Sequence, residues 1–370
     1  MTTSPVDYSH DELLASHDYA EPLIAGGVRC HGGFNADGVY MSPRTKNRVP
    51  AIDAWQAQRA AQFDTPLLDL PLDTWPEHYP NVAQARLLVE VGTPEPVISI
   101  LTRIGTVEGF GGMIRHSVVP DLQKVFVEDT RHTAMAHLDR GLYEAHARDE
   151  AGHGEQAGHD HMWFAARDIA FEHPVTVDET VLMLERMGIP QPGAGGRIDI
   201  SRLRAQAMAA RALPDDLDFD LESLMTRMIR LLLIEISAFH AFAWAEELLG
   251  DPDLVAGDGQ AGTLVSYIRS DETPHVRYLA TVLSEMRDRT FVGESGRTYA
   301  GTRIIGQLWD SAVERSLGVG RDESLEMTWG EVTHALAGRA DGDDVLEQFN
   351  ALGSMRRRAD GSWEHAAKVA

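Results

Sequence analysis

Residues 262–289 read GTLVSYIRSDETPHVRYLATVLSEMRDR, and this stretch decides the fold. Leucine, isoleucine, valine and methionine recur in it at steps of three and four, which predicts a helix with one buried face. Glu272 and His275 fall on that face, three residues apart. Because a buried carboxylate without a partner costs several kcal/mol, the pattern predicts positive charge close to Glu272 in the core.

Three earlier segments carry the same signature. Helices are predicted over about 96–118, about 130–172 and about 221–249. Each places one acid at the centre of its apolar stripe: Glu108, Glu150 and Glu235. No lysine or arginine occupies these stripe positions beside the acids, whereas two divalent cations would neutralise four carboxylates. The four helices therefore predict a buried metal site.

The second and fourth helices also share a motif. Asp149-Glu150-Ala151-Gly152-His153 matches Asp271-Glu272-Thr273-Pro274-His275 in the pattern Asp-Glu-x-x-His. Carboxylate oxygens with imidazole nitrogens suit iron or manganese. The predicted metal ligands are Glu108, Glu150, His153, Glu235, Glu272 and His275. Asp149 and Asp271 are predicted to orient the histidines, since metal-bound imidazoles need an outer carboxylate to fix their tautomer.

His146 is a candidate for an additional ligand. It precedes Glu150 by four residues and lies on the same helix face. A hydrogen bond within the core is the alternative interpretation. A further Glu-x-x-His, at Glu331 and His334, lacks the preceding aspartate and is interpreted as surface.

The order of these motifs resembles the ferritin-like di-iron carboxylate oxygenases and oxidases. That family includes bacterial multicomponent monooxygenases, acyl-carrier-protein desaturases and arylamine N-oxygenases, and the resemblance covers roughly residues 95–290. It implies an all-α fold, a ferritin-like four-helix bundle with a long crossover. It also implies two iron ions, with a manganese/iron pair as the alternative, and a homodimer is common among such proteins.

The resemblance further implies an enzyme that uses O2 to oxidise a small organic substrate by hydroxylation, desaturation, N-oxygenation or oxidative cleavage. The alternative is an iron-handling or peroxide-detoxifying protein without an organic substrate. The chain carries no flavin or nicotinamide fingerprint, so the enzyme would need an external electron donor such as a ferredoxin. The basic run at 356–358 would dock an acidic donor or form a solvated helix end.

Five residues are candidates for a substrate pocket beside the metals. Gly112 follows Glu108 by one turn and removes a side chain there, which either opens a pocket or lets helices pack closely. Arg115 would bind a substrate carboxylate or form a surface salt bridge. Ala238, Phe239 and Phe242 follow Glu235 and would form an apolar wall or simply pack in the core.

Composition sets the remaining expectations. The domain prediction is a loop-rich arm over 1–93 packed on the bundle, the bundle itself over 94–290, and a helical extension over 291–370. A single cysteine, Cys30, excludes an internal disulfide and favours the cytoplasm. A formal net charge of −24 disfavours nucleic acid and anionic lipid as partners. No run of eighteen apolar residues occurs, so no membrane span is expected.

Overall fold

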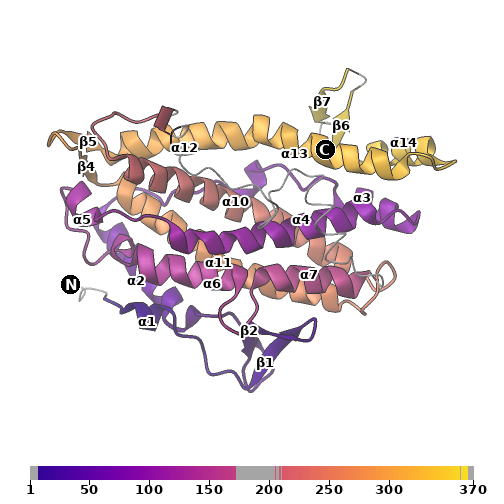
Figure 1. The fold of residues 1–370 in the computed structure, drawn as a ribbon, viewed down its shortest axis with the longest axis horizontal. Helices are drawn as coiled ribbons and strands as arrows, with labels where there is room; N and C mark the ends of the chain where they lie inside the picture. Colours follow the sequence, from indigo (N-terminus) through magenta and orange to yellow (C-terminus); the bar gives the residue numbers. More distant parts are fainter. Residues whose placement is uncertain (1–6, 172–204, 206–207, 210, 359, 366–370) are drawn as a thin grey trace.

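The computed structural model describes residues 7–171, 205, 208–209, 211–358 and 360–365. Within them the chain is mostly helical, which confirms the predicted all-α class (Figure 1). Most of the predicted crossover, including Pro190 and Pro192, lies outside the described residues.

The N-terminal arm holds more regular structure than its composition suggests. Its elements are α1 (His10–Leu13), β1 (Glu21–Ala25), β2 (Val28–Phe34), β3 (Tyr40–Met41), α2 (Thr45–Gln62), η1 (Leu72–Thr74) and α3 (Val82–Glu90). The three strands form an antiparallel sheet in the order β1-β2-β3. Helix α2 packs on the bundle, where the Gln56 amide donates to Thr281 Oγ1 over 2.9 Å. The arm therefore lies against the centre of the protein.

The central region is built from α4 (Glu95–Gly111), η2 (Gly112–His116), α5 (Leu122–Val125), η3 (Ala134–His137), η4 (Leu138–Tyr143), α6 (Glu144–Ala151), α7 (His159–Ala170), α10 (Phe219–Leu249) and α11 (Gln260–Arg287). Helix α10 packs along α11, α11 against α7, and α4 against α7 and α6. The four acid-bearing segments thus pack together with their apolar stripes inward.

The single helix predicted over about 130–172 is wrong. The segment begins with a 3₁₀ turn and a short π-helix, continues as α6, and breaks before α7. The break begins at Gly152, which has φ 74° and ψ 178°. This backbone region is open essentially only to glycine, so the helix ends there.

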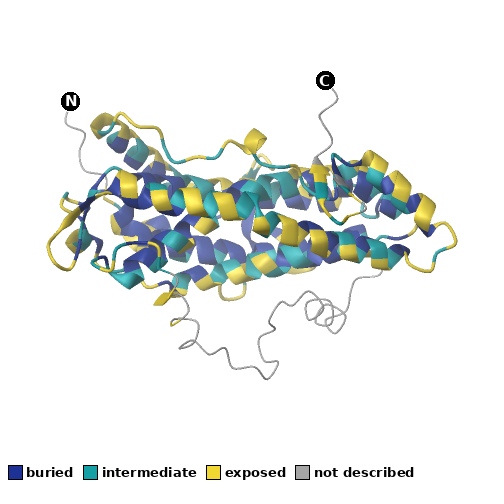
Figure 2. Ribbon diagram, turned by 90° about the horizontal axis from the view of Figure 1, so that it is seen from above, coloured by how far each residue is buried: buried dark blue, intermediate teal, exposed yellow. Residues whose placement is uncertain are grey.

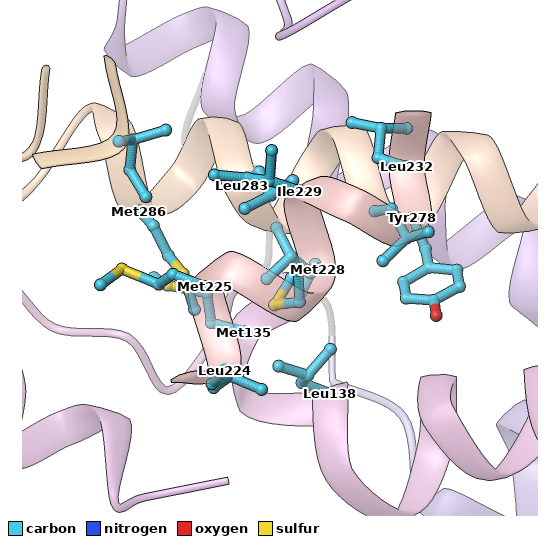
Figure 3. Packing of buried hydrophobic residues seen from close by; sticks show 14 of the residues in the cluster. Met135, Leu138, Leu224, Met225, Met228, Ile229, Leu232, Tyr278, Leu283 and Met286 are labelled. Atoms are coloured by element: carbon cyan, nitrogen blue, oxygen red, sulfur yellow. The ribbon is translucent and has the colours of Figure 1, made fainter. Parts of the chain in front are cut away.

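Two apolar clusters enclose the middle of the bundle. Figure 3 shows one of them, in which Leu224, Met225 and Met228 of α10 gather with Met135 and Met286. The other centres on Trp163 of α7 and Phe242 of α10, whose rings stack 5.7 Å apart. Along α10 and α11 the acids fall between the two clusters, so water is kept from them at both ends.

The C-terminal extension comprises β4 (Thr290–Val292), β5 (Thr298–Ala300), α12 (Gly301–Leu317), α13 (Val319–Leu336), α14 (Gly342–Leu352), β6 (Met355–Arg357) and β7 (Trp363–His365). Figure 1 shows its helices along one side of the bundle. Glu331 of α13 pairs with Arg103 of α4 over 3.2 Å, so this Glu-x-x-His serves to attach the extension. In the basic run, Arg357 pairs with Glu326 and Arg358 with Glu364.

Two helical stretches, Glu95–His116 and Phe219–Leu249, are long and apolar enough to cross a membrane by length and composition. The core helices of soluble proteins meet the same criterion, and each of these two carries one of the inward-facing acids. Figure 2 shows buried residues on the inward faces of the packed helices and exposed residues outside. The expectation that the protein has no membrane partner stays a prediction.

Candidate metal centre

Seven inward-facing side chains form two overlapping groups at the middle of the bundle. The first group is His146, Glu150, Glu235 and His275; the second is Glu108, Glu150, His159 and Glu272. Within each group the ligand atoms all lie within 4.8 Å of one another. Glu150 belongs to both groups, so the two sets adjoin.

The first group joins α6, α10 and α11. His146 Nε2 lies 3.2 Å from Glu235 Oε1 and 3.4 Å from Glu150 Oε1. His275 Nδ1 lies 3.3 Å from the same Glu150 oxygen. All four residues are buried, so their charged forms need neighbouring groups of opposite charge or a bound cation to stabilise them.

The second group joins α4, α6, α7 and α11. His159 Nδ1 lies 2.7 Å from Glu272 Oε1, 3.6 Å from Glu150 Oε1 and 3.7 Å from Glu108 Oε2. Glu108 is the most exposed of these, with 12% of its side chain accessible. Glu272 also reaches the first group, since its Oε2 lies 2.5 Å from His275 Nδ1.

The structure places His153 outside the cluster and brings in His159 instead. Helix α6 ends at Ala151, so three-residue spacing no longer keeps His153 on the face of Glu150, and its side chain is exposed. The chain then turns within a short loop that β2 holds in place, since Ala157 N donates to Arg29 O over 2.9 Å. His159 follows in the first turn of α7 and points inward.

Glycine at both ends makes this loop tight. A Cβ at Gly158 would lie 2.4 Å from the carbonyl oxygen of Glu150. The sequence signal for the loop was available, because residues 152–158 contain three glycines. His159 also begins an apolar stripe that continues through Met162, Trp163 and Ala166, and this pattern predicts an inward-facing histidine.

Several buried polar atoms at the cluster have no hydrogen-bond partner among the residues that the structure describes. They are Glu150 Oε1, His159 Nδ1 and Glu272 Oε1. These atoms converge although none bonds another with acceptable geometry. Such unpaired atoms are uncommon in a protein core unless an ion or water satisfies them. A cation would satisfy all three, so the donor set fits a metal.

Without metal, protons would have to supply the missing positive charge. Burial acts to lower the pKa of His159, but the charge of Glu272 and the hydrogen bond to Asp271 raise that pKa well above 6.5. At His275, too, burial acts to lower the pKa, but the neighbouring Glu272 and Asp149 raise it well above 6.5.

The pKa values of the carboxyl groups in the cluster are shifted in opposite directions. Burial, with the charge of Glu272, raises the pKa of Glu235 to about 7. Burial and the charges of Glu150 and Glu272 raise the pKa of Glu108 well above its usual range. At Glu150 the effect of burial, which raises the pKa, is outweighed by the close imidazoles of His146, His159 and His275, which hold the pKa well below its usual range.

The two aspartates lie crosswise behind the histidines. Asp149, beside Glu150, has its Oδ2 3.0 Å from Nε2 of His275, whereas Asp271, beside Glu272, has its Oδ2 3.4 Å from Nε2 of His159. Asp149 of α6 therefore orients His275 of α11, and Asp271 of α11 orients His159 of α7. In both imidazoles this directs Nδ1 toward the cluster.

The N-terminal arm holds both aspartates in place. Arg44 donates through Nε to Asp149 Oδ1 over 2.8 Å, and Arg48 Nη2 lies 2.8 Å from Asp149 Oδ2. The hydroxyl of Tyr40 donates to Asp271 Oδ2 over 2.8 Å. These three residues could not be predicted from the sequence, because the arm carries no periodic pattern that would place them.

His146 has a different support. Its Nδ1 lies 2.9 Å from the hydroxyl of Tyr278, which is fully buried. A hydroxyl can accept from Nδ1–H and so leave Nε2 free to face Glu150 and Glu235. His146 could therefore act as a metal ligand that a neutral hydroxyl holds from behind.

The predicted pocket residues are distributed around this centre. A Cβ at Gly112 would lie 2.6 Å from Ala151 Cβ, so this glycine permits close packing of η2 on α6. Arg115 lies 3.6 Å from Glu144 and so forms a salt bridge. Phe242 is buried, and Phe239 and Ala238 are partly buried against the same apolar cluster. A role in binding substrate stays a prediction for all five candidates.

Comparison of the chain with models of protein families gave no match, and neither did comparison with curated proteins or with solved structures.

Proposed function

We propose that this protein binds two iron ions in a ferritin-like four-helix bundle and uses them to oxidise a small organic substrate with dioxygen. The observation that supports this is the pair of overlapping four-residue groups sharing Glu150. Four glutamates and two divalent cations sum to zero charge. The metal would therefore remove the electrostatic cost of burying the four acids.

The residues divide into two ligand sets. One ion would be held by His146, Glu150, Glu235 and His275, and the other by Glu108, Glu150, His159 and Glu272. Nitrogen and oxygen ligands in this ratio suit iron, with a manganese/iron pair as the alternative. Bound iron would supply the redox chemistry that protein side chains lack.

The chain's own groups prepare the site for that chemistry. Asp149 and Asp271 hold two imidazoles in one tautomer, and the apolar clusters on either side exclude water. Insertion of one oxygen atom into a substrate sends the other to water, which consumes two electrons and two protons per dioxygen. The electrons would come from an external donor such as a ferredoxin. The donor, a cytoplasmic location and a homodimer stay predictions.

The test is metal content after anaerobic loading with ferrous iron and desalting. About two irons per chain are expected for the natural protein and fewer for Glu235→Ala, and the loaded protein should then consume dioxygen. Iron uptake far beyond two per chain would support iron handling instead. No retained iron, or binding indifferent to Glu235→Ala, would overturn the proposal. Retained iron without oxygen consumption would indicate a structural metal site.

A further inference from the structure

A groove of about 790 Å³ lies between α10 and the segment formed by the end of α4 and η2. Apolar side chains line much of it, including Phe110, Ile114, Leu231 and Ile234. Phe110 and Ile234 are exposed, at 41% and 51%. Sites for small organic molecules typically measure about 300–1,000 Å³ and are mainly apolar.

The inner end of the groove adjoins the metal centre. Gly111 lines the groove, and a Cβ at Gly111 would lie 2.6 Å from Cγ of Glu150, so its backbone rests directly against that ligand. On the opposite wall Ile234 precedes Glu235, and Leu231 lies one helical turn before it. A molecule in the groove would thus extend toward Glu150 and Glu235.

The outer part of the groove is positively charged. Arg227 and Arg230 both line it, and neither forms a salt bridge among the residues the structure describes. Within the described part of the chain, Arg227 donates to Ser117 Oγ over 2.6 Å and to no carboxylate. The acidic residue on the same wall, Glu222, already accepts from Arg211 and from the backbone of Ala212. Two guanidiniums without an acidic partner in the described ranges are unexpected on a chain of net charge −24.

We propose that the groove binds the substrate and that the substrate is a small carboxylate with an apolar body. This inference rests on the proposed function. Guanidinium groups recognise carboxylates through paired, charge-assisted hydrogen bonds. Arg230 precedes Glu235 by five residues, which is roughly 7.5 Å along the helix axis at 1.5 Å per residue. A carboxylate held by Arg227 and Arg230 would place the apolar body along Leu231 and Ile234, with its far end at the metal centre.

The experiment compares 4-phenylbutyrate with its neutral amide, 4-phenylbutanamide, by titration calorimetry on the full chain. The carboxylate should bind about tenfold more tightly than the amide, because a charge-assisted bond is lost in the amide. Arg230→Gln combined with Arg227→Gln should abolish this preference, and Ile234→Trp should weaken both probes by filling the groove. Arg303→Gln, an exposed arginine on α12 outside the groove, is the matched control and should change nothing.

Equal binding of acid and amide, or an unchanged preference in the arginine variants, would overturn the inference. So would the absence of binding to the natural protein. Iron content is measured on the same samples. Normal iron with no carboxylate preference would reject the groove and leave the proposed metal centre standing, whereas a clear preference without iron would reject the metal centre alone.

Discussion

The two Asp-Glu-x-x-His motifs are alike in sequence and different in structure. In α11 the helix continues from Glu272 through His275, and both residues face the cluster. In α6 the helix ends one residue after Glu150, so His153 is exposed and His159 faces the cluster from α7. Residue spacing predicts a shared face only while the helix persists. Glycines, rather than the ligands themselves, decide where it stops.

The largest expected effect separates the two aspartates. Asp149→Ala would remove the carboxylate that pairs with both Arg44 and Arg48, which are buried, and loss of one partner of a buried ion pair lowers the free energy of unfolding by about 3–5 kcal/mol. Asp271→Ala removes hydrogen bonds to Tyr40 and His159 but leaves no arginine without its partner. The free energy of unfolding is therefore expected to fall by about 1–3 kcal/mol. Urea denaturation of the metal-free variants measures both changes in the free energy of unfolding. Equal losses would show that the arm stabilises the Asp149 side and the Asp271 side of the cluster to the same extent.

The next prediction separates the two histidines. His159→Ala should lower retained iron from about two to about one per chain, with affinity at the affected site falling at least about 100-fold, because removal of a ligand exceeds the loss of an outer partner. His153→Ala should retain both ions. Iron assay after anaerobic loading decides between them. Loss of iron in His153→Ala with retention in His159→Ala would contradict the structure. It would support the prediction that a continuous helix places Glu150 and His153 on one face.

The loop that causes the difference can be tested through its glycines. Gly152→Ala forces a side chain into a glycine-only conformation with its Cβ 2.5 Å from the carbonyl oxygen of Gln156, whereas a Cβ at Gly154 meets nothing within 4 Å. Both have positive φ, so Gly154→Ala is the matched control. We expect the free energy of unfolding to fall by about 2–3 kcal/mol in Gly152→Ala and by about 1 kcal/mol in Gly154→Ala. Thermal denaturation with equal shifts would contradict the account of the break.

The smallest effect concerns pH. The pKa values of His159 and His275 are raised in the metal-free protein, so their contribution to stability is complete below pH 6.5 and is lost as pH rises through the raised values. Metal must displace these protons, and ferrous affinity should therefore increase by about tenfold or more between pH 6 and pH 8. Asp149→Asn should reduce this dependence at His275. An affinity that is flat with pH would mean that the imidazoles bind iron without releasing protons.

Sequence could predict the helices that keep one period throughout. Residues 221–249 and 262–289 show uninterrupted stripes, and their three inward-facing metal candidates, Glu235, Glu272 and His275, meet in the structure. Glu108 and Glu150 were accessible by the same argument. His159 could be predicted only if the helix was ended at the glycines of residues 152–158, because a helix continued past Gly152 places the wrong histidine inside. Tyr40, Arg44 and Arg48 were beyond reach for another reason, since their contacts depend on how an aperiodic arm docks on distant helices.

The docking of that arm on Asp149 and Asp271 makes residues 40–48 part of the support of the candidate metal centre. By thermodynamic linkage, anything that favours the correctly oriented histidines also favours the attached arm. Iron occupancy and protection of residues 40–48 from a protease should therefore rise together. In a cell, chains that have failed to acquire metal would be the ones whose N-terminal arms are open to cleavage, so degradation would select against the empty form.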